Sequence, residues 1–193
     1  MSTTEFADQK RHATLEIWNH VVSIRRDSTP PHVLEIGTGG DGFVNFIPDA
    51  FCVGLEPLLF KMRRSGVGIF LPSAHFVCGV GERLPFHSDS FDVAFLYNVL
   101  DHAAEPGAIL DELPRVLRAG GILHFLVDTY SLSFKVYRKF LRPDSLHPHT
   151  FTPREIHRML ASRRFRLVED HSDLRPVGRR RNRKIRAFYR LEK

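Results

Sequence analysis

Three glycines in the stretch VLEIGTGGDG, residues 33–42, follow the spacing G-x-G-x-x-G: they are Gly37, Gly39 and Gly42. Glycines at this spacing let the backbone of a loop pass close to a ligand at the end of a strand. Glu56 follows 19 residues after Gly37, as an acid does in the dinucleotide fingerprint. The pattern therefore predicts a site for a nucleotide cofactor, and NAD is the first candidate to test against the neighbouring charges.

The charges around this loop argue against NAD. A dinucleotide places its pyrophosphate over such a loop, where backbone N–H groups favour anions. Here Glu35 precedes the first glycine by two positions, and Asp41 lies within the loop. Two carboxylates would repel a pyrophosphate, whereas a cofactor with an ammonium and a sulfonium would be attracted. The charge pattern favours a cationic sulfur compound, and an NAD-dependent oxidoreductase remains the alternative.

A second group of residues could move a proton. Asp101 and His102 follow the apolar run FDVAFLYNVL, and Asp128 ends the run ILHFLVD. The carboxyl ends of parallel strands meet at one sheet edge, so these residues should lie together there, with His147 and His149 approaching from a later segment. Histidine is the usual base near neutral pH. The candidate catalytic residues are Asp101, His102 and His149. Asp101 or His102 could instead only shape the pocket, and HPH, residues 147–149, could be a rigid turn before a helix. A metal site formed by Asp101, Asp128, His147 and His149 is a less favoured alternative.

Apolar runs and helical segments alternate along the chain, which argues for a mostly parallel sheet covered on both sides. We expect strands at 32–36, 51–56, 75–79, 91–100, 122–128, 165–170 and 184–193, and helices at 6–26, 57–67, 107–119 and 152–163. Pro114 should bend the third helix or mark its start, and Gly120-Gly121 should cap its end. The prediction is one domain over residues 1–193.

Composition sets broad limits on function. The 193 residues are 42% hydrophobic and 26% charged, which suits one globular core. No apolar run approaches a membrane span, and the first residues lack a signal-peptide core. Cys52 and Cys78 lie in apolar runs and are expected to be buried thiols of a reduced compartment, so the expected location is the cytoplasm. Residues 175–193 hold nine basic residues and one acid, so the net charge of +6 is local to the C-terminus.

Several ordered motifs strengthen the sulfonium interpretation. They are LEIGTGG, VGLEP, GVGERLPFHSDSFDVAFLYNVLDHAAEP and LDELPRVLRAGGILHF, and they extend over residues 33–126. Together they resemble the class I S-adenosylmethionine-dependent methyltransferases, in the small-molecule group that includes the ubiquinone/menaquinone-type enzymes.

The resemblance implies an α/β, Rossmann-like three-layer sandwich. Its seven-stranded sheet has the order 3-2-1-4-5-7-6, with residues 184–193 as the antiparallel seventh strand. Residues 33–126 would form the cofactor-binding core, after an N-terminal helix within residues 1–30. Residues 129–150 would form a lid over the acceptor, and residues 175–193 a basic C-terminal strand region.

The resemblance also assigns roles residue by residue. Glu35, Gly37, Thr38, Gly39, Gly40 and Asn98 would surround the methionine part of S-adenosylmethionine, Glu56 would accept from the ribose hydroxyls, and Pro57, Gly81 and Glu82 would flank the adenine. Two positions depart from the family pattern: Val80 replaces an Asp that accepts from the adenine amino group, and Asp41 takes the place of the third glycine of the loop.

The implied function is transfer of a methyl group from S-adenosylmethionine to an oxygen, nitrogen or carbon of an unidentified small molecule. One alternative is an RNA or protein methyltransferase that uses the basic cluster Arg179–Lys184, although no RNA-binding motif or aromatic platform accompanies that cluster. Another is a non-catalytic module that binds S-adenosylmethionine. Beyond the small-molecule acceptor, we expect no membrane span and no metal.

Overall fold

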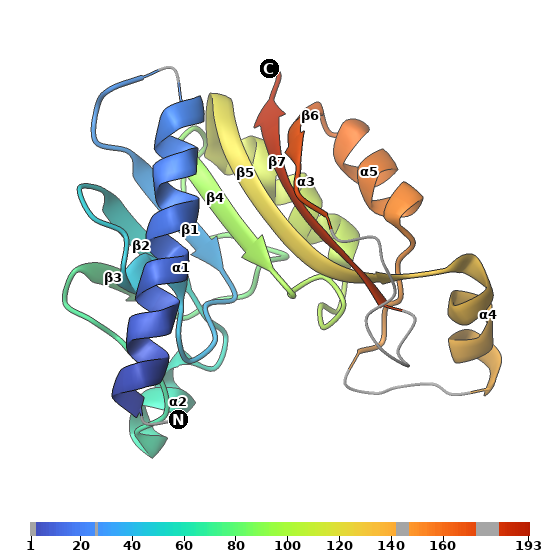
Figure 1. Ribbon diagram of the computed structural model, residues 1–193, viewed down its shortest axis with the longest axis horizontal. Helices are drawn as coiled ribbons and strands as arrows, with labels where there is room; N and C mark the ends of the chain where they lie inside the picture. The colour runs from blue at the N-terminus through green and yellow to red at the C-terminus, as the bar shows by residue number, and fades with distance from the viewer. Residues whose placement is uncertain (1–2, 26, 142–146, 173–181) are drawn as a thin grey trace.

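The computed structural model describes residues 3–25, 27–141, 147–172 and 182–193, and within these residues seven strands form a single sheet. The order is β3-β2-β1-β4-β5-β7-β6, and β7 runs antiparallel to both of its neighbours, which confirms the predicted topology (Figure 1). The strands are β1 (His32–Ile36), β2 (Phe51–Leu55), β3 (Ala74–Val77), β4 (Phe91–Tyr97), β5 (Leu117–Tyr130), β6 (Phe165–Asp170) and β7 (Asn182–Leu191).

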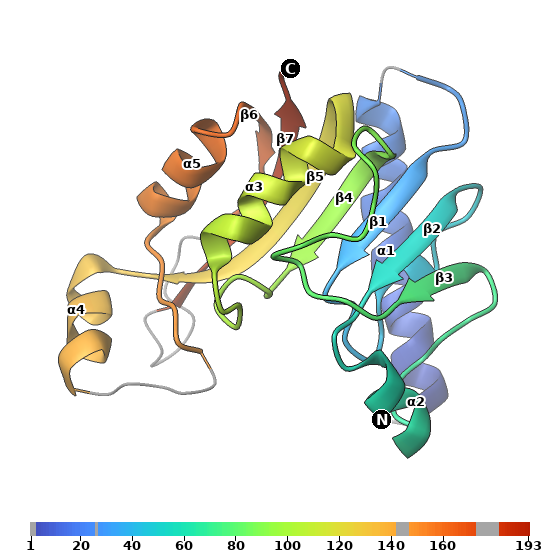
Figure 2. The ribbon, with the colours of Figure 1, turned by 180° about the vertical axis from the view of Figure 1, so that it is seen from behind.

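Helices cover both faces of this sheet, as a three-layer sandwich requires. The long α1 (Thr3–Ile24) crosses one face (Figure 1), and α3 (Pro106–Val116) and α5 (Pro153–Ala161) lie on the other (Figure 2). The short α2 (Leu59–Ser65) follows β2, and α4 (Leu132–Leu141) follows the far end of β5. Between β1 and β2 the chain forms only the 3-10 turn η1 (Phe43–Asn45), so α1 is the principal cover of its face.

Strand side chains alternate between the two faces and so build two apolar cores. Under α1, Trp18 and Val21 pack with Phe95 and Phe188. The larger core under α3 and α5 includes Phe125 and 25 other buried residues. Among the described residues, no helix is both long and apolar enough to cross a bilayer.

The junction between α3 and β5 differs from the sequence prediction. The helix ends at Val116, and β5 begins immediately at Leu117, which pairs with Phe91. The pairing then shifts register, and the next partners are Val93 and Ile122. Gly120 has a φ of +77° within this irregular part of β5. Gly120-Gly121 therefore serve a bulge in the strand, and the prediction that they cap the helix was wrong.

Two further sequence expectations can be compared with local structure. Cys52 is buried as expected, but Cys78 is exposed because β3 ends at Val77, one residue before it. The predicted start of α5 is confirmed: the Thr152 hydroxyl accepts from the Glu155 N–H, and the Glu155 carboxylate accepts from the Thr152 N–H. This reciprocal capping box provides acceptors for two backbone N–H groups that would otherwise be unpaired at the helix start.

Candidate cofactor and acceptor site

The glycine loop leaves the end of β1 and is held against β2. The Gly37 N–H donates to the Leu55 carbonyl at 2.8 Å. Gly37 has a φ of +71°, and a Cβ there would lie 2.6 Å from Cγ2 of Val99, so the fold requires glycine at this position. Gly39 also has a positive φ, of +57°, but a Cβ built on it would meet no atom within 4 Å. The backbone at Gly39 is therefore open to a ligand.

Glu56 ends β2 and binds the same loop. Its side chain is only 6% exposed, and its Oε2 accepts from the Gly39 N–H at 2.9 Å. Its Oε1 accepts from the Leu58 N–H, also at 2.9 Å. A carboxylate has further lone pairs beyond these two bonds. Glu56 thus positions the glycine loop and keeps acceptor capacity at the end of the strand.

Glu35 lies in β1 with only 3% of its surface exposed. Burial raises the pKa of this carboxyl group to about 7, although hydrogen bonds from the backbone of Val44 and Phe43 and the charge of Lys10 act in the opposite direction. The bond from the Val44 N–H to Oε2 is 3.0 Å. Glu35 is therefore divided between its neutral and ionised forms near neutral pH.

Asp41, the other acid of the loop, forms an ion pair with Lys10 of α1, with 3.0 Å between Nζ and Oδ2. Lys10 also lies over the Phe43 ring, 4.4 Å from its centroid. From the sequence, Glu35 and Asp41 were expected to be two uncompensated carboxylates beside the glycines. The structure corrects this: one is paired, and the other, Glu35, has a raised pKa. The charge argument against a pyrophosphate is accordingly weaker than the sequence suggested.

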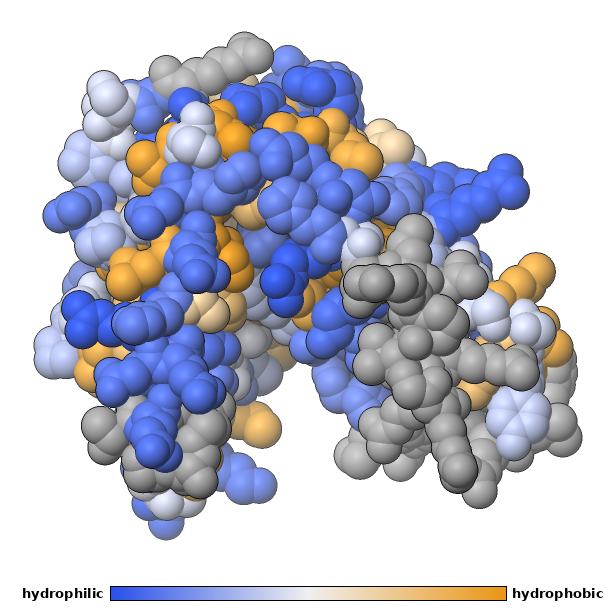
Figure 3. Space-filling model, viewed as in Figure 1, coloured by the Kyte–Doolittle hydropathy of each residue, from blue (hydrophilic) through white to orange (hydrophobic). Residues whose placement is uncertain are grey.

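A cavity of about 420 Å³ begins at the glycine loop and extends beneath α1 to β7. On the loop side, the cavity is lined by Glu35, Gly37, Thr38, Gly39, Asp41 and Phe43. Tyr97 at the end of β4, Asn98 just after it and Leu126 of β5 form the floor, and Lys10 and Ile17 of α1 form one wall. Lys184 and Arg186 of β7 line the far end. Figure 3 shows the molecular surface hollowed beside α1, at the carboxyl edge of the sheet. Asn98 lies there with a φ of +50°.

Lys10, Tyr97 and Arg186 line the site, but none of them was expected there from the sequence. Arg186 could have been found from the alternation of β7, in which Ile185 and Ala187 are buried and Arg186 is exposed. Lys10 had no local signal, because only the packing of α1 across the sheet brings it to the loop. Tyr97 is the last residue of β4, and its hydroxyl hydrogen-bonds to Nδ1 of the buried His124.

The residues assigned to the adenine lie beyond this cavity. Pro57 is exposed, and Gly81 is buried, with the place of a Cβ only 2.9 Å from Ile36. Glu82 Oε1 accepts from the Ala104 N–H at 3.0 Å, so this carboxylate binds the backbone just before α3. Val80, at the position where the family has an acid, is 49% exposed.

The structure brings together only part of the candidate catalytic group. Asp101 is buried, and its Oδ2 lies 3.9 Å from Nε2 of His102. The His102 ring centroid is 4.4 Å from that of His147. His149 instead stacks on Phe151, and only its backbone N–H reaches the Asp101 carbonyl, at 3.4 Å. The proton-transfer candidates that meet are therefore Asp101, His102 and His147.

The four residues considered for a metal do not assemble as a set. Asp128 faces Lys184, with 3.8 Å between Oδ1 and Nζ. Among the described residues, donor atoms of Asp101, His102 and His147 lie within 4.8 Å of one another. Residues 142–146 of the expected lid are outside the described residues. In the part described, α4 is tied to α5 by an ion pair of 2.6 Å between Lys135 and Glu155.

Part of the chain is similar in sequence to known methyltransferases. Residues 34–125 match a family described as a methyltransferase domain. The chain is 30% identical over 93 residues to a protein of Mycobacterium leprae (strain Br4923) named an uncharacterized methyltransferase; the match covers 47% of this chain and 35% of the relative. The chain thus spans about a third of the length of the curated relatives it matches.

Solved structures share the fold over most of the chain. A methyltransferase of Burkholderia thailandensis, solved with 1,6-didemethyltoxoflavin and S-adenosylhomocysteine, matches with a TM-score of 0.65 and 16% identity over 95% of this chain and 79% of that one. An S-adenosylmethionine-dependent methyltransferase of Methanosarcina mazei matches with a TM-score of 0.62 and 20% identity over 86% and 95%.

The sheet order and these comparisons show that the chain has the α/β, Rossmann-like fold of the solved methyltransferases that it matches. Residues 34–125, just under half of the chain, are similar to a methyltransferase domain.

Proposed function

We propose that this chain binds S-adenosylmethionine over the glycine loop and transfers its methyl group to a small molecule held beneath α1. The observation that carries the proposal is the continuous cavity that joins the loop, the end of β4 and β7. The loop residues suit the cofactor: Gly39 offers bare backbone, and Glu56 lies at the end of β2 with spare lone pairs.

The cofactor would lie along the carboxyl edge of the sheet. The loop Gly37–Gly40 and Asn98 would contact its methionine part, and Glu35 would face the ammonium. Glu56 would accept from the ribose hydroxyls. Pro57, Gly81 and Glu82 would border the adenine, with Glu82 acting mainly through the start of α3, where its carboxylate is already engaged.

The far end of the cavity supports an anionic acceptor. Lys10 is paired with Asp41, and Lys184 faces Asp128. Arg186 lines the same cavity, and no acid of the described residues lies within ion-pair distance of its guanidinium. An unpaired guanidinium favours a carboxylate or phosphate partner. The acidic residues at the loop and the arginine at β7 would thus orient a cationic donor against an anionic acceptor.

When bound, the cofactor supplies an electrophilic methyl group on a sulfonium. The chain itself holds the acceptor atom in line with that group, and such alignment alone can lower the barrier by several kcal/mol, roughly 7 or more in favourable cases. Where the acceptor carries a proton, His102 would take it, with Asp101 stabilising the imidazolium that forms. Asp101 and His102 follow Asn98 by three and four residues, at the same sheet edge.

Calorimetry with S-adenosylhomocysteine tests the cofactor site. Gly39→Arg should abolish binding, because its side chain would occupy the open side of the loop. Gly66→Arg is the matched control: Gly66 also has a positive φ, of +66°, and open space at its Cβ, but it caps α2 outside the cavity. Equal affinity in the two variants would contradict the proposed site. A thermal shift produced by NAD alone would favour the oxidoreductase alternative.

Isotope transfer from labelled S-adenosylmethionine tests the acceptor class. Incubation with acidic and neutral metabolite fractions should label a compound in the acidic one. Arg186→Gln should reduce that labelling, whereas Arg154→Gln, an exposed arginine of α5, should not. Labelling confined to neutral compounds would exclude an anionic acceptor. Labelling of added RNA or protein would favour the alternative in which the basic cluster binds the acceptor; Arg179–Arg181 of that cluster lie outside the described residues. Binding of S-adenosylmethionine without any methyl transfer would favour the non-catalytic module.

A further inference from the structure

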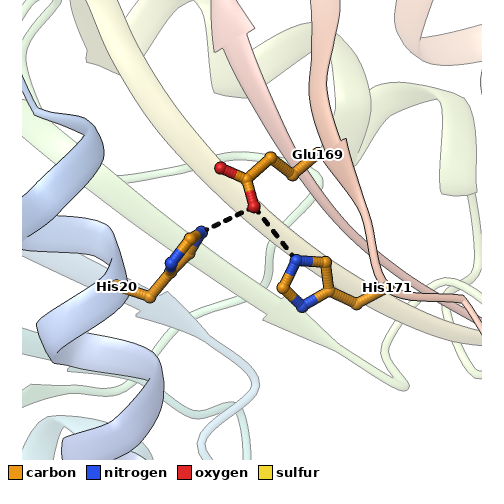
Figure 4. Close-up of side chains that lie close together, drawn as sticks. All are labelled: His20, Glu169 and His171. Atoms are coloured by element: carbon orange, nitrogen blue, oxygen red, sulfur yellow. Dashed lines mark hydrogen bonds and ion pairs between the residues drawn. The ribbon is translucent and has the colours of Figure 1, made fainter.

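Two histidines and one glutamate, side chains of types that can bind a metal, meet on the face of the sheet that α1 covers. His20 comes from α1, Glu169 from β6 and His171 from the residues just after β6 (Figure 4). Nε2 of His20 lies 3.0 Å from Oε2 of Glu169, and Nε2 of His171 lies 3.1 Å from the same oxygen. All three donor atoms fall within 4.8 Å of one another.

These separations match those around a tetrahedral zinc ion. Bonds of about 2.0–2.1 Å at tetrahedral angles place neighbouring ligand atoms about 3.3 Å apart. A set of two imidazoles and one carboxylate is also a donor set that zinc uses, with water in the fourth position.

The surroundings hold the two imidazoles in place before any ion binds. The His20 ring packs 4.7 Å from the ring of Phe188, and the His171 ring lies 5.5 Å from the same phenylalanine. His20 Nε2 is buried, and despite its proximity to Glu169 it makes no hydrogen bond of acceptable geometry within the described residues. A buried nitrogen without a well-aligned partner is costly, and a cation between the three groups would satisfy it. Glu169 and His171 are partly exposed, which leaves an ion a route from solvent.

We propose that His20, Glu169 and His171 bind one zinc-like divalent cation that clamps α1 to the outer edge of the sheet. Such an ion would also act on the cavity, because α1 supplies Lys10 and Ile17 to its wall. The His171 N–H donates to the carbonyl of Arg186 at 2.8 Å, so both ends of the clamp adjoin cavity residues. The inference rests on the geometry of these three side chains and not on the methyltransferase activity.

Zinc titration of the chelator-treated full chain, followed by calorimetry at mildly alkaline pH, tests the site. The wild type should bind one Zn²⁺ at this site, and His20→Ala and His171→Ala should each weaken that binding by more than about tenfold. His87→Ala removes an exposed histidine far along the sequence from the cluster and should leave the affinity unchanged. Zinc affinity that is the same in the wild type and in both cluster variants would overturn the proposal.

A second measurement separates a metal clamp from a purely hydrogen-bonded contact. Zn²⁺ should raise the melting temperature of the wild type, because a ligand that binds only the folded chain stabilises it. His171→Gln retains a hydrogen-bonding side chain at a half-exposed position and should fold normally, but the zinc-dependent increase should be lost. If zinc raised the melting temperature of His171→Gln as much as that of the wild type, the cluster would not be the site.

Discussion

Because Glu35 is buried, we expect Glu35→Gln to change how the free energy of unfolding depends on pH. Burial, the largest cause, raises the pKa of Glu35 from its ordinary value of 4.5 to about 7. Below pH 4.5 the group is protonated in both the folded and the unfolded chain. As the pH rises from 4.5 to 7, the unfolded chain ionises first and the free energy of unfolding falls; above pH 7 the loss is complete.

The expected size of this effect follows from the same two values. One pH unit corresponds to about 1.4 kcal/mol, so the wild type should lose on the order of 3 kcal/mol of stability across this range. Glutamine does not titrate, and its side-chain oxygen can still accept from the Val44 N–H, which now bonds to Oε2 at 3.0 Å. Any other cost of the substitution adds a constant offset, so the pH dependence of the difference is the informative quantity.

Urea denaturation at a series of pH values between 5 and 8.5 provides the assay. The difference in unfolding free energy between Glu35→Gln and the wild type should shift in favour of the variant as the pH rises, and should level off above pH 7. Glu16→Gln replaces an exposed glutamate of α1 and should show no such trend. A constant difference across the series, or one that shifts toward the wild type, would refute the reasoning from burial.

Three further substitutions test other parts of the site and fold. Glu56→Ala leaves two backbone N–H groups without their acceptor. It should therefore lower the free energy of unfolding, measured by urea denaturation, by roughly 1–3 kcal/mol. It should also weaken the binding of S-adenosylhomocysteine in calorimetry. Gly37→Ala should destabilise the chain by about 1–3 kcal/mol, because a Cβ there combines a positive φ with a 2.6 Å contact to Val99; adding Val99→Ala should recover part of that loss in the same assay. Thr152→Ala breaks the capping box with Glu155 and should cost about 1 kcal/mol in thermal unfolding, with cofactor affinity unchanged.

The cover of the cavity depends on one helix. Between β1 and β2 there is only the short η1, so the face above the cavity depends on α1, which precedes the whole sheet. Trp18 and Val21 of α1 are buried against that face. Arg190 of β7 donates to the carbonyl of Ile24 at 2.7 Å and so fixes the last residue of the helix. Truncation of α1 would therefore expose both an apolar core and the cavity.

Local features of the sequence determined much of the architecture. The apolar runs marked the strands, since a buried parallel strand needs uninterrupted hydrophobic residues. Thr152 and Pro153 marked the start of α5, because the signals for a helix start depend only on neighbouring residues. The resemblance carried by the motifs over residues 33–126 implied the strand order, which the fold confirms. It also assigned Glu56 to the cofactor site, and the structure shows this carboxylate bound to the glycine loop.

Only the tertiary structure decided the contacts between distant segments. The pairing of Lys10 with Asp41, the engagement of Glu82 at the start of α3, and the meeting of His20 with Glu169 each join residues with no local signal for one another. The ionisation of Glu35 likewise depends on how completely the surrounding chain excludes water. The charge and burial of a side chain depend on all the residues that surround it in space, whereas a sequence motif contains only residues that are neighbours along the chain.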